Sequence, residues 1–363
     1  MKKILPLLLV WAVSVSAHAF SFSAPATSGQ TLYFTIVNGA AVKVVAPATV
    51  GWGGYSAPTG QLEIPATVIN EGTTYSVTAI DRMAFQDCGD ITSVIIPGSV
   101  ISVGQRAFTG DTMLTKAVLG EGVQRIDMMA FNACTRLDTI VLPSTLTRIA
   151  VSAFDNTAYY NNADNWSSDM MLMLGEWVIK VGNQAVGTIN VPEDIRGVAN
   201  NAFLYCRYVD KVMLPSTMRY VGEGAFKDCY ELDTLQLESI EPPVLSDDSF
   251  DGVNPLPVLV VPCSTATDYS AAQYWNAFTI VEAPCSSAID EVEAMPTLSV
   301  TVVNDGVIVY GAEGTTLTVC DMMGRRIGQV LHATSQQHLL LPLSGVYVLL
   351  SGSEAIKISY SIR

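Results

Sequence analysis

A phenylalanine preceded by alanine recurs every 23 residues in this chain, and this interval constrains the fold more than any local pattern. After a gap of 49 residues the spacing resumes. The six phenylalanines are Phe85, Phe108, Phe131, Phe154, Phe203 and Phe226. A period between about 20 and 50 residues is typical of a solenoid, in which each repeat stacks on the next. A solenoid presents a long, repetitive face to a partner rather than one deep catalytic cleft.

Other residue types keep the same register as the phenylalanine. An isoleucine or valine lies five residues before it in all six repeats. Four repeats have a cysteine three residues after it, and four, not all the same ones, have a proline eleven residues before it. Apolar residues alternate ahead of the proline, as in a short half-buried strand, and proline ends that strand because it cannot donate to the ladder. The rest of the repeat is too short for a regular helix, so we expect a second short strand or a tight turn. The sequence therefore predicts a mainly β solenoid in which phenylalanine stacks on phenylalanine.

This repeat, as written in Ile91–Phe108 and Leu137–Phe154, resembles the BspA-type leucine-rich repeat of bacterial surface proteins. Further segments resemble the start and the last turn of that family's solenoid, namely Gly29–Tyr33, Pro58–Gly60 and Leu62–Pro65 at the start and Val260–Cys263, Tyr269 and Trp275–Phe278 at the end. The resemblance covers residues 29–282. It implies a leucine-rich-repeat fold and a cell-surface binding or adhesion role, without a defined ligand.

Composition divides the chain into five parts. Lys2 and Lys3 precede the apolar run Ile4–Ala17, and a small-x-small site ends at Ala19, which predicts a secretory signal peptide. A membrane anchor is the alternative, but the run is too short to span, and no later stretch reaches spanning length. We predict a signal peptide at 1–19, an N-terminal β cap at 20–76, a leucine-rich-repeat solenoid at 77–282 with a hairpin insertion at about 155–188, a linker at 283–297 and a β-sandwich domain at 298–363.

The last part resembles the C-terminal sorting domain of the type IX secretion route. The residues that carry this resemblance are Asp321-Met322-Met323-Gly324-Arg325, Gly345-Val346-Tyr347 and Lys357. Cys320 stands where that family usually has an aromatic residue. The resemblance implies an export address, contact with the secretion machinery, and a secreted or outer-membrane-associated location; whether the tail is cleaved stays open. The alternative is a generic β domain that binds a ligand itself.

The long interval after the fourth phenylalanine contains a predicted hairpin. Two apolar runs, Met170–Leu174 and Trp177–Val181, are parted by a Gly-Glu pair. Insertions in repeat arrays often carry function, and Trp166 and Trp177 are the local aromatic residues that a glycan would need. The alternative is that both tryptophans pack the hairpin onto the solenoid.

The chain is poor in groups for catalysis or metal binding. A formal net charge of −15 excludes an electrostatic nucleic-acid binder. Beyond the signal, the histidines are His332 and His338, both in the tail, so a Ser-His-Asp or Cys-His arrangement inside the solenoid is excluded. Asp247, Asp248 and Asp251 lack the spacing of a calcium loop and are interpreted as a solvated turn. We expect no catalytic, metal-binding or cofactor-binding residues, although a carboxylate pair for glycoside hydrolysis stays open.

Seven cysteines in an exported chain raise the question of disulfides. Four share one repeat position and are interpreted as small buried residues: Cys88, Cys134, Cys206 and Cys229. Cys206 and Cys229 fall on adjacent turns and could pair only if their side chains tilt together. Cys263 and Cys285 lie outside the register and flank the final turn, so we predict a disulfide between them, which leaves Cys320 free.

Alternation along the predicted strands assigns two outward columns to the solenoid. The first contains Ser93, Lys116, Thr139, Lys211 and Thr234, and the second Ile95, Val118, Val141, Met213 and Gln236. Asn190 interrupts the second column at the turn that contains Pro192. Four stacked apolar residues facing solvent would mark an interaction surface. The alternative is that an adjacent layer or the insertion hairpin covers them.

These patterns favour an exported, non-enzymatic binding protein, an adhesin or host-protein interactor that uses its exposed strand face. The expected partner is a protein, or alternatively a glycan, on a host or neighbouring cell. A secreted hydrolase is disfavoured because an open repeat array offers no enclosed pocket.

Overall fold

The computed structural model describes residues 20–48, 51–246, 248–285, 299–303, 305–321, 325–342, 344–351 and 354–360. The predicted signal peptide and residues 286–297 of the predicted linker lie outside these ranges. The described chain forms two compact units, of which the first ends at Cys285. Within the described ranges, no helix is long and apolar enough to cross a membrane.

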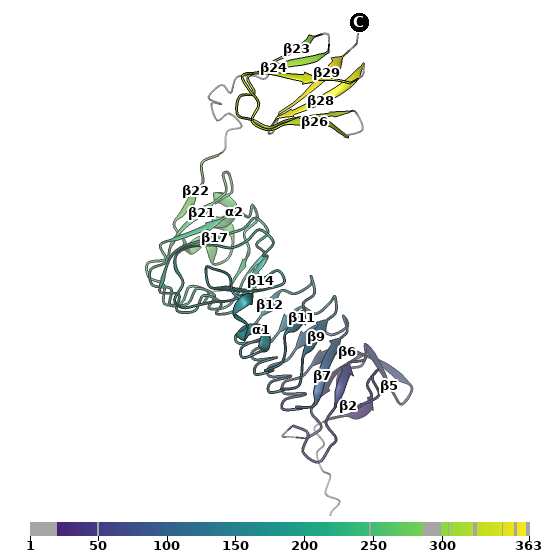
Figure 1. Cartoon of the computed structure of the whole chain (residues 1–363). Coiled ribbons are helices and arrows are strands. Elements are labelled where there is room, and N and C mark those ends of the chain that lie inside the picture. The colour runs from purple at the N-terminus through teal and green to yellow at the C-terminus, as the bar shows by residue number, and fades with distance from the viewer. Residues whose placement is uncertain are drawn as a thin grey trace, which may run out of the picture. The chain divides into compact units, whose positions relative to one another are not determined.

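The first unit is a β-solenoid of about nine turns, as the repeat predicted. Most turns contribute one longer strand and one two-residue strand, and within each block the strands of one kind pair with one another in parallel. The longer strands of the first block are β4 (Gly60–Glu63), β7 (Ile91–Ile96), β9 (Lys116–Leu119) and β11 (Thr139–Val141), of which the last three are labelled as neighbours in Figure 1.

The short strands of the first block continue a sheet that begins near the N-terminus. They are β8 (Ser102–Val103), β10 (Arg125–Ile126) and β12 (Arg148–Ile149). The strands before them are β1 (Phe22–Pro25), β2 (Thr31–Asn38), β3 (Ala41–Val45) and β6 (Thr73–Ile80), with β5 (Thr67–Asn70) beside β6. Trp52, between β3 and β4, places its ring over Phe85 at 6.1 Å and donates its Nε1–H to the Ala84 carbonyl. The segment predicted as a cap therefore packs on the first phenylalanine of the column.

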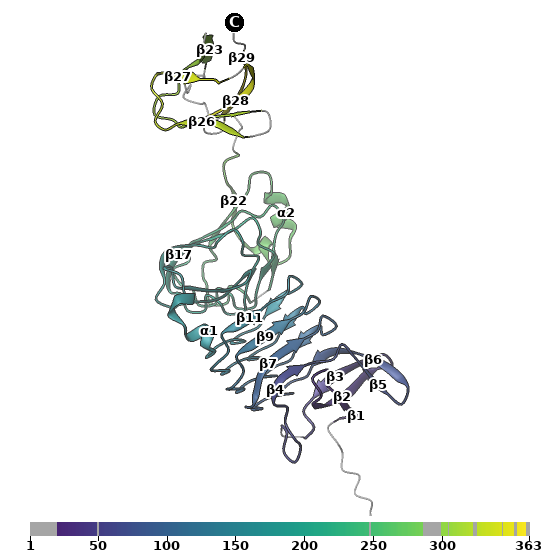
Figure 2. The same ribbon diagram turned by 45° about the vertical axis from the view of Figure 1, so that its right-hand side comes forward.

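A second block of turns follows the insertion (Figure 2). Its longer strands are β15 (Val186–Asn190), β17 (Tyr208–Leu214), β19 (Thr234–Leu237), β21 (Val258–Val261) and β22 (Ile280–Glu282). Its short strands are β16 (Gly197–Val198), β18 (Tyr220–Val221) and β20 (Val244–Leu245). The insertion is an antiparallel hairpin of β13 (Met171–Leu174) and β14 (Trp177–Val181), as predicted, and β14 pairs with β16. The short helices are α1 (Ala158–Asn161), η1 (Ala163–Asn165), α2 (Ala266–Ala271) and η2 (Trp275–Ala277).

The phenylalanines of consecutive turns stack in the core, which confirms the prediction. Phe131 lies 5.1 Å from Phe108 and 5.6 Å from Phe154, with its ring nearly parallel to both, and all three rings are buried. Backbone hydrogen bonds run between the same turns, since Phe131 N–H donates to the Ala153 carbonyl at 2.8 Å. The residues two positions before and after Phe131 have φ of 58°, and such left-handed residues bend the chain sharply around each buried ring.

The second unit consists of two antiparallel sheets. One contains β23 (Ser299–Val303), β24 (Gly306–Tyr310) and β27 (Gln336–Leu340). The other contains β25 (Leu317–Asp321), β26 (Arg326–Val330), β28 (Gly345–Ser351) and β29 (Glu354–Tyr360). Val307 and Leu339 from the first sheet share an apolar core with Val319, Leu349 and Ile358 from the second.

Candidate binding surfaces

The first block aligns six of the predicted outward residues in two columns. Along β7, β9 and β11 the register is Ser93–Lys116–Thr139 and Ile95–Val118–Val141. Val141 is 46% exposed, Lys116 and Thr139 are also exposed, and the other three are half-buried. The alternate residues of β7 are buried, so the strand presents one face to the core and one outward.

The other four predicted residues form separate columns in the second block. Lys211 pairs with Thr234, and Met213 pairs with Gln236, across β17 and β19. All four are half-buried. Because the chain leaves the array after β12, β11 and β15 belong to different sheets. The predicted strip of four apolar residues is therefore wrong in one respect: Met213 does not continue the column that ends at Val141.

The insertion hairpin does not cover these columns. Because β14 pairs with β16, the hairpin extends the sheet of short strands instead. Helix α1 lies beside the last turn of the first block, where Tyr159 N–H donates to the Leu137 carbonyl at 2.9 Å (Figure 2).

The tryptophans of the insertion do not provide the open aromatic faces that a glycan would need. Trp166 donates its Nε1–H to the Tyr160 carbonyl at 2.9 Å and packs edge-on against the Tyr160 ring. Trp177 is 2% exposed and lies parallel to Tyr220 at 5.9 Å. Trp177 therefore packs the hairpin onto the solenoid, as the alternative expected, whereas Trp166 packs within the insertion.

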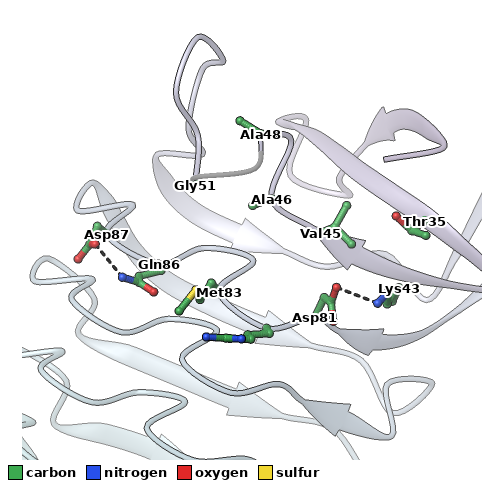
Figure 3. Close-up of a pocket in the computed structure, with 11 residues that line it drawn as sticks. Thr35, Lys43, Val45, Ala46, Ala48, Gly51, Asp81, Met83, Gln86 and Asp87 are labelled. Atoms are coloured by element: carbon green, nitrogen blue, oxygen red, sulfur yellow. Dashed lines mark hydrogen bonds and ion pairs between the residues drawn. The ribbon is translucent and has the colours of Figure 1, made fainter. Parts of the chain in front are cut away.

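A hollow of about 690 Å³ lies where β3 meets the first turn (Figure 3). On its wall Lys43 Nζ lies 2.8 Å from Asp81 Oδ2. Arg82 and Asp87 add one charge of each sign, and Gln86 donates to Asp87 at 3.1 Å. The four charges cancel, so the hollow has no net charge with which to select an ionic ligand.

Sequence reasoning missed a cluster of exposed tyrosines beside the second block. Tyr205, Tyr208 and Tyr230 are 45%, 58% and 55% exposed. The Arg207 guanidinium lies 5.3 Å from the Tyr205 ring and 5.4 Å from the Tyr230 ring. Tyr205 lies two residues after Phe203, and Tyr230 lies four residues after Phe226. The first block has no tyrosine at either position, and this difference between the blocks was the signal in the sequence that could have revealed the cluster.

The cysteine column contains one carboxyl group. Cys88, Cys134, Cys206 and Cys229 are buried free thiols, as interpreted from the repeat. Asp111 takes the equivalent position between Cys88 and Cys134, is fully buried, and has no hydrogen-bond partner for either carboxyl oxygen. Burial, together with the charge of Asp87, raises the pKa of Asp111 to about 9. Burial also raises the pKa of the Cys88 and Cys134 thiols, so all three groups are protonated at neutral pH.

Cys263 and Cys285 form a disulfide across 22 residues of sequence, with Cα atoms 4.8 Å apart. Cys263 follows β21 and Cys285 follows β22, which pair in parallel. The bond therefore joins the chain just beyond the last two longer strands. Cys320 in the second unit is free and half-buried.

Among the described residues, no three His, Cys, Asp or Glu lie close enough to hold a metal ion. His338 Nε2 lies 3.1 Å from Asp305 Oδ1. Asp251 pairs with Lys227, Asp248 is exposed, and Asp247 lies outside the described residues.

Several solved structures are similar to this chain. A leucine-rich repeat protein from Bacteroides capillosus is 27% identical over 36% of this chain and 91% of its own, with a TM-score of 0.32. One from Bacteroides ovatus is 15% identical over 73% and 100%, with a TM-score of 0.34. A leucine rich cell surface protein from Faecalibacterium prausnitzii is 18% identical over 74% and 96%, with a TM-score of 0.27. No curated protein matches the chain in sequence.

The family assignment rests on a family model rather than on these likenesses. The model for the BspA type leucine rich repeat region matches residues 68–168 and 182–292 in six copies, which is more than half of the chain. The matched residues contain the stacked phenylalanines and both blocks of the solenoid except β4. The chain therefore belongs to the BspA-type leucine-rich-repeat family.

Proposed function

We propose that this protein is an exported, non-enzymatic binding protein, a cell-surface adhesin or host-protein interactor, whose partner contacts the outward face of the longer strands. The observation that carries the proposal is the column Ile95–Val118–Val141, an apolar row on the outer face of a parallel sheet. Val141 is 46% exposed, and the insertion lies on another sheet. Apolar rows left open to solvent in this way mark interaction surfaces.

The neighbouring column suits a protein partner. Lys116 and Thr139 flank the apolar row and are exposed, so the face has an apolar centre with a polar margin. Protein interfaces have the same anatomy, with a buried apolar core and a solvated rim. Successive turns repeat the arrangement every 23 residues, which lets one partner contact several turns at once.

A double substitution, Val118→Asp with Val141→Asp, tests this face. Two carboxylates in the apolar row would be desolvated without a partner charge, so binding to immobilised extracellular-matrix proteins is expected to fall to background. Both side chains point outward, so the melting midpoint should stay close to that of the unaltered protein. Ile69→Asp, on β5 and 68% exposed, is the matched control and should bind normally. Binding that survives the double substitution would remove the face from consideration, and capture on a glycan array alone would favour the glycan alternative.

We also propose that the C-terminal unit acts as an export address. Arg325 donates its backbone N–H to Asp321 Oδ1 at 2.9 Å and its Nε–H to Asp321 Oδ2 at 2.8 Å, so the two ends of the Asp-x-x-x-Arg motif are held together. The middle residues of the motif lie outside the described residues. Protease added to intact cells should digest the full chain and should spare a chain lacking residues 298–363. Equal digestion of the two would contradict an address in this unit.

A further inference from the structure

A second candidate site lies on the sheet of short strands, away from the face proposed above. It is a cleft of about 240 Å³ where the two blocks of the solenoid meet. The first block lines it with Arg125 and Arg148, and the second with Tyr220, Glu223 and Val244. It does not involve Val118 or Val141, so this site and the strand face can be tested independently.

The cleft exists because one outward column is interrupted at the junction. In the first block the column contains Arg125 beside Arg148, and in the second it contains Gly197, Tyr220 and Val244. Gly197 has no side chain, and a Cβ there would lie 2.5 Å from the Trp177 ring. The ring covers the glycine instead and stacks on Tyr220. The cleft therefore has an aromatic and apolar wall on one side and two arginines on the other.

The charges in the cleft are unequal. Arg125 and Arg148 are register partners on neighbouring strands, and like charges in that position destabilise a sheet. Glu223 Oε2 lies 3.4 Å from Arg148 Nη2 and accepts from Asn200 Nδ2 at 2.8 Å. Within the described residues, Arg125 has no carboxylate within ion-pair distance, and Arg148 Nε has no acceptor. The cleft thus contains two guanidinium groups and one carboxylate, in a chain whose formal net charge is −15.

We propose that this cleft binds a sugar residue that carries a carboxylate. The carboxylate pairs with the Arg125 guanidinium, whose planar fork matches it with two hydrogen bonds. The sugar ring lies against Tyr220 and Val244, and its hydroxyls donate to Glu223 Oε1, which has no partner among the described residues. A cleft of about 240 Å³ suits one ring and not a long chain.

An acidic peptide side chain fits the cleft less well. It would satisfy Arg125, but an aspartate or glutamate side chain has no hydroxyl that could donate to Glu223. A sugar ring supplies both the charge for Arg125 and the donors for Glu223. Among the described residues, the cleft has one guanidinium without a carboxylate partner and one carboxylate oxygen without a donor. A sugar that carries a carboxylate can satisfy both groups, and this favours the sugar.

Saturation-transfer NMR on the intact mature protein, with D-glucuronate as the probe, tests the proposal. Glucuronate should receive saturation and glucose should not, and raising NaCl from about 50 mM to about 500 mM should weaken binding because an ion pair is screened. Arg125→Gln should weaken glucuronate binding by about tenfold. Arg136→Gln is the matched control, since Arg136 is also exposed, donates to the Met113 sulfur and does not line the cleft.

The experiment distinguishes lost binding from lost folding, because Arg125 is exposed and its replacement leaves the core intact. Unchanged melting curves for both variants, with binding lost only in Arg125→Gln, would support the site. No saturation transfer to glucuronate, equal transfer to glucose, or full binding in Arg125→Gln would overturn it. Binding of N-acetyl-aspartate in place of glucuronate would also overturn it, in favour of an acidic peptide.

Discussion

Asp111 departs most from the repeat pattern, because it places a buried carboxyl group where four other repeats have a cysteine. Its pKa is about 9 in the folded protein and about 3.9 in an unfolded chain. Between these values the folded state holds a proton that the unfolded state has released, so stability falls as pH rises. The contribution of Asp111 is fully present below about pH 4 and declines by about 1.4 kcal/mol per pH unit up to about pH 9.

Replacing this residue by the one typical of the repeat should remove that dependence. Asp111→Cys places a thiol between Cys88 and Cys134 and is expected to raise the free energy of unfolding at about pH 8 by several kcal/mol. At about pH 4 the gain should be much smaller. Urea unfolding at the two pH values, under reducing conditions, measures the difference. Asp90→Asn, at an exposed position, should leave the slope unchanged, and a slope that persists in Asp111→Cys would show that Asp111 ionises normally.

The phenylalanine column is the element that joins each turn to its neighbours. Phe131→Ala removes a buried ring that stacks on Phe108 and Phe154, which costs about 3–5 kcal/mol for a large-to-small change in a core. Asp138→Ala changes an exposed residue in the same turn and should stay within about 0.5 kcal/mol. Denaturant unfolding of the two variants compares them directly. Equal midpoints would contradict a stacked core.

This column extends further than the Ala-Phe pattern indicates. Phe250 stacks on Phe226 at 4.9 Å, although serine precedes it and the spacing is 24 residues. Phe278 then packs edge-on against Phe250 and ends the column. The pattern missed Phe250 because the prediction required the alanine, whereas stacking depends on the ring and on the register of the turns.

At the scale of the molecule, the disulfide closes the end of the first unit. Breaking it by Cys263→Ser with Cys285→Ser should lower the free energy of unfolding of this unit by roughly 3 kcal/mol, because the bond closes a loop of 22 residues that is otherwise free in the unfolded chain. Denaturant unfolding followed by tryptophan fluorescence measures the loss. Cys320→Ser removes a free thiol from the second unit and should leave the transition of residues 20–285 in place. A double variant as stable as the unaltered protein would mean that the final turn needs no covalent closure.

The repeat alone determined most of the architecture. Residues at equal positions in consecutive turns have the same environment, so one pattern predicted the stacked phenylalanines, the buried thiols and the outward columns of each block. The hairpin was predicted from a local pattern instead, because two apolar runs separated by a Gly-Glu dipeptide pair with each other. These features depend on neighbours that are close in sequence or one period apart.

Only the tertiary structure decided where the array is interrupted and what that interruption creates. Pairing of β14 with β16 places the insertion in the short-strand sheet and separates Val141 from Met213. It also brings Arg148 to Glu223, 75 residues away in sequence. A periodic pattern predicts contacts between equivalent positions of consecutive repeats, and Arg148 and Glu223 do not occupy equivalent positions. The longer strands of the two blocks therefore form separate columns, and the charged cleft where the blocks meet depends on contacts that exist only in the folded chain.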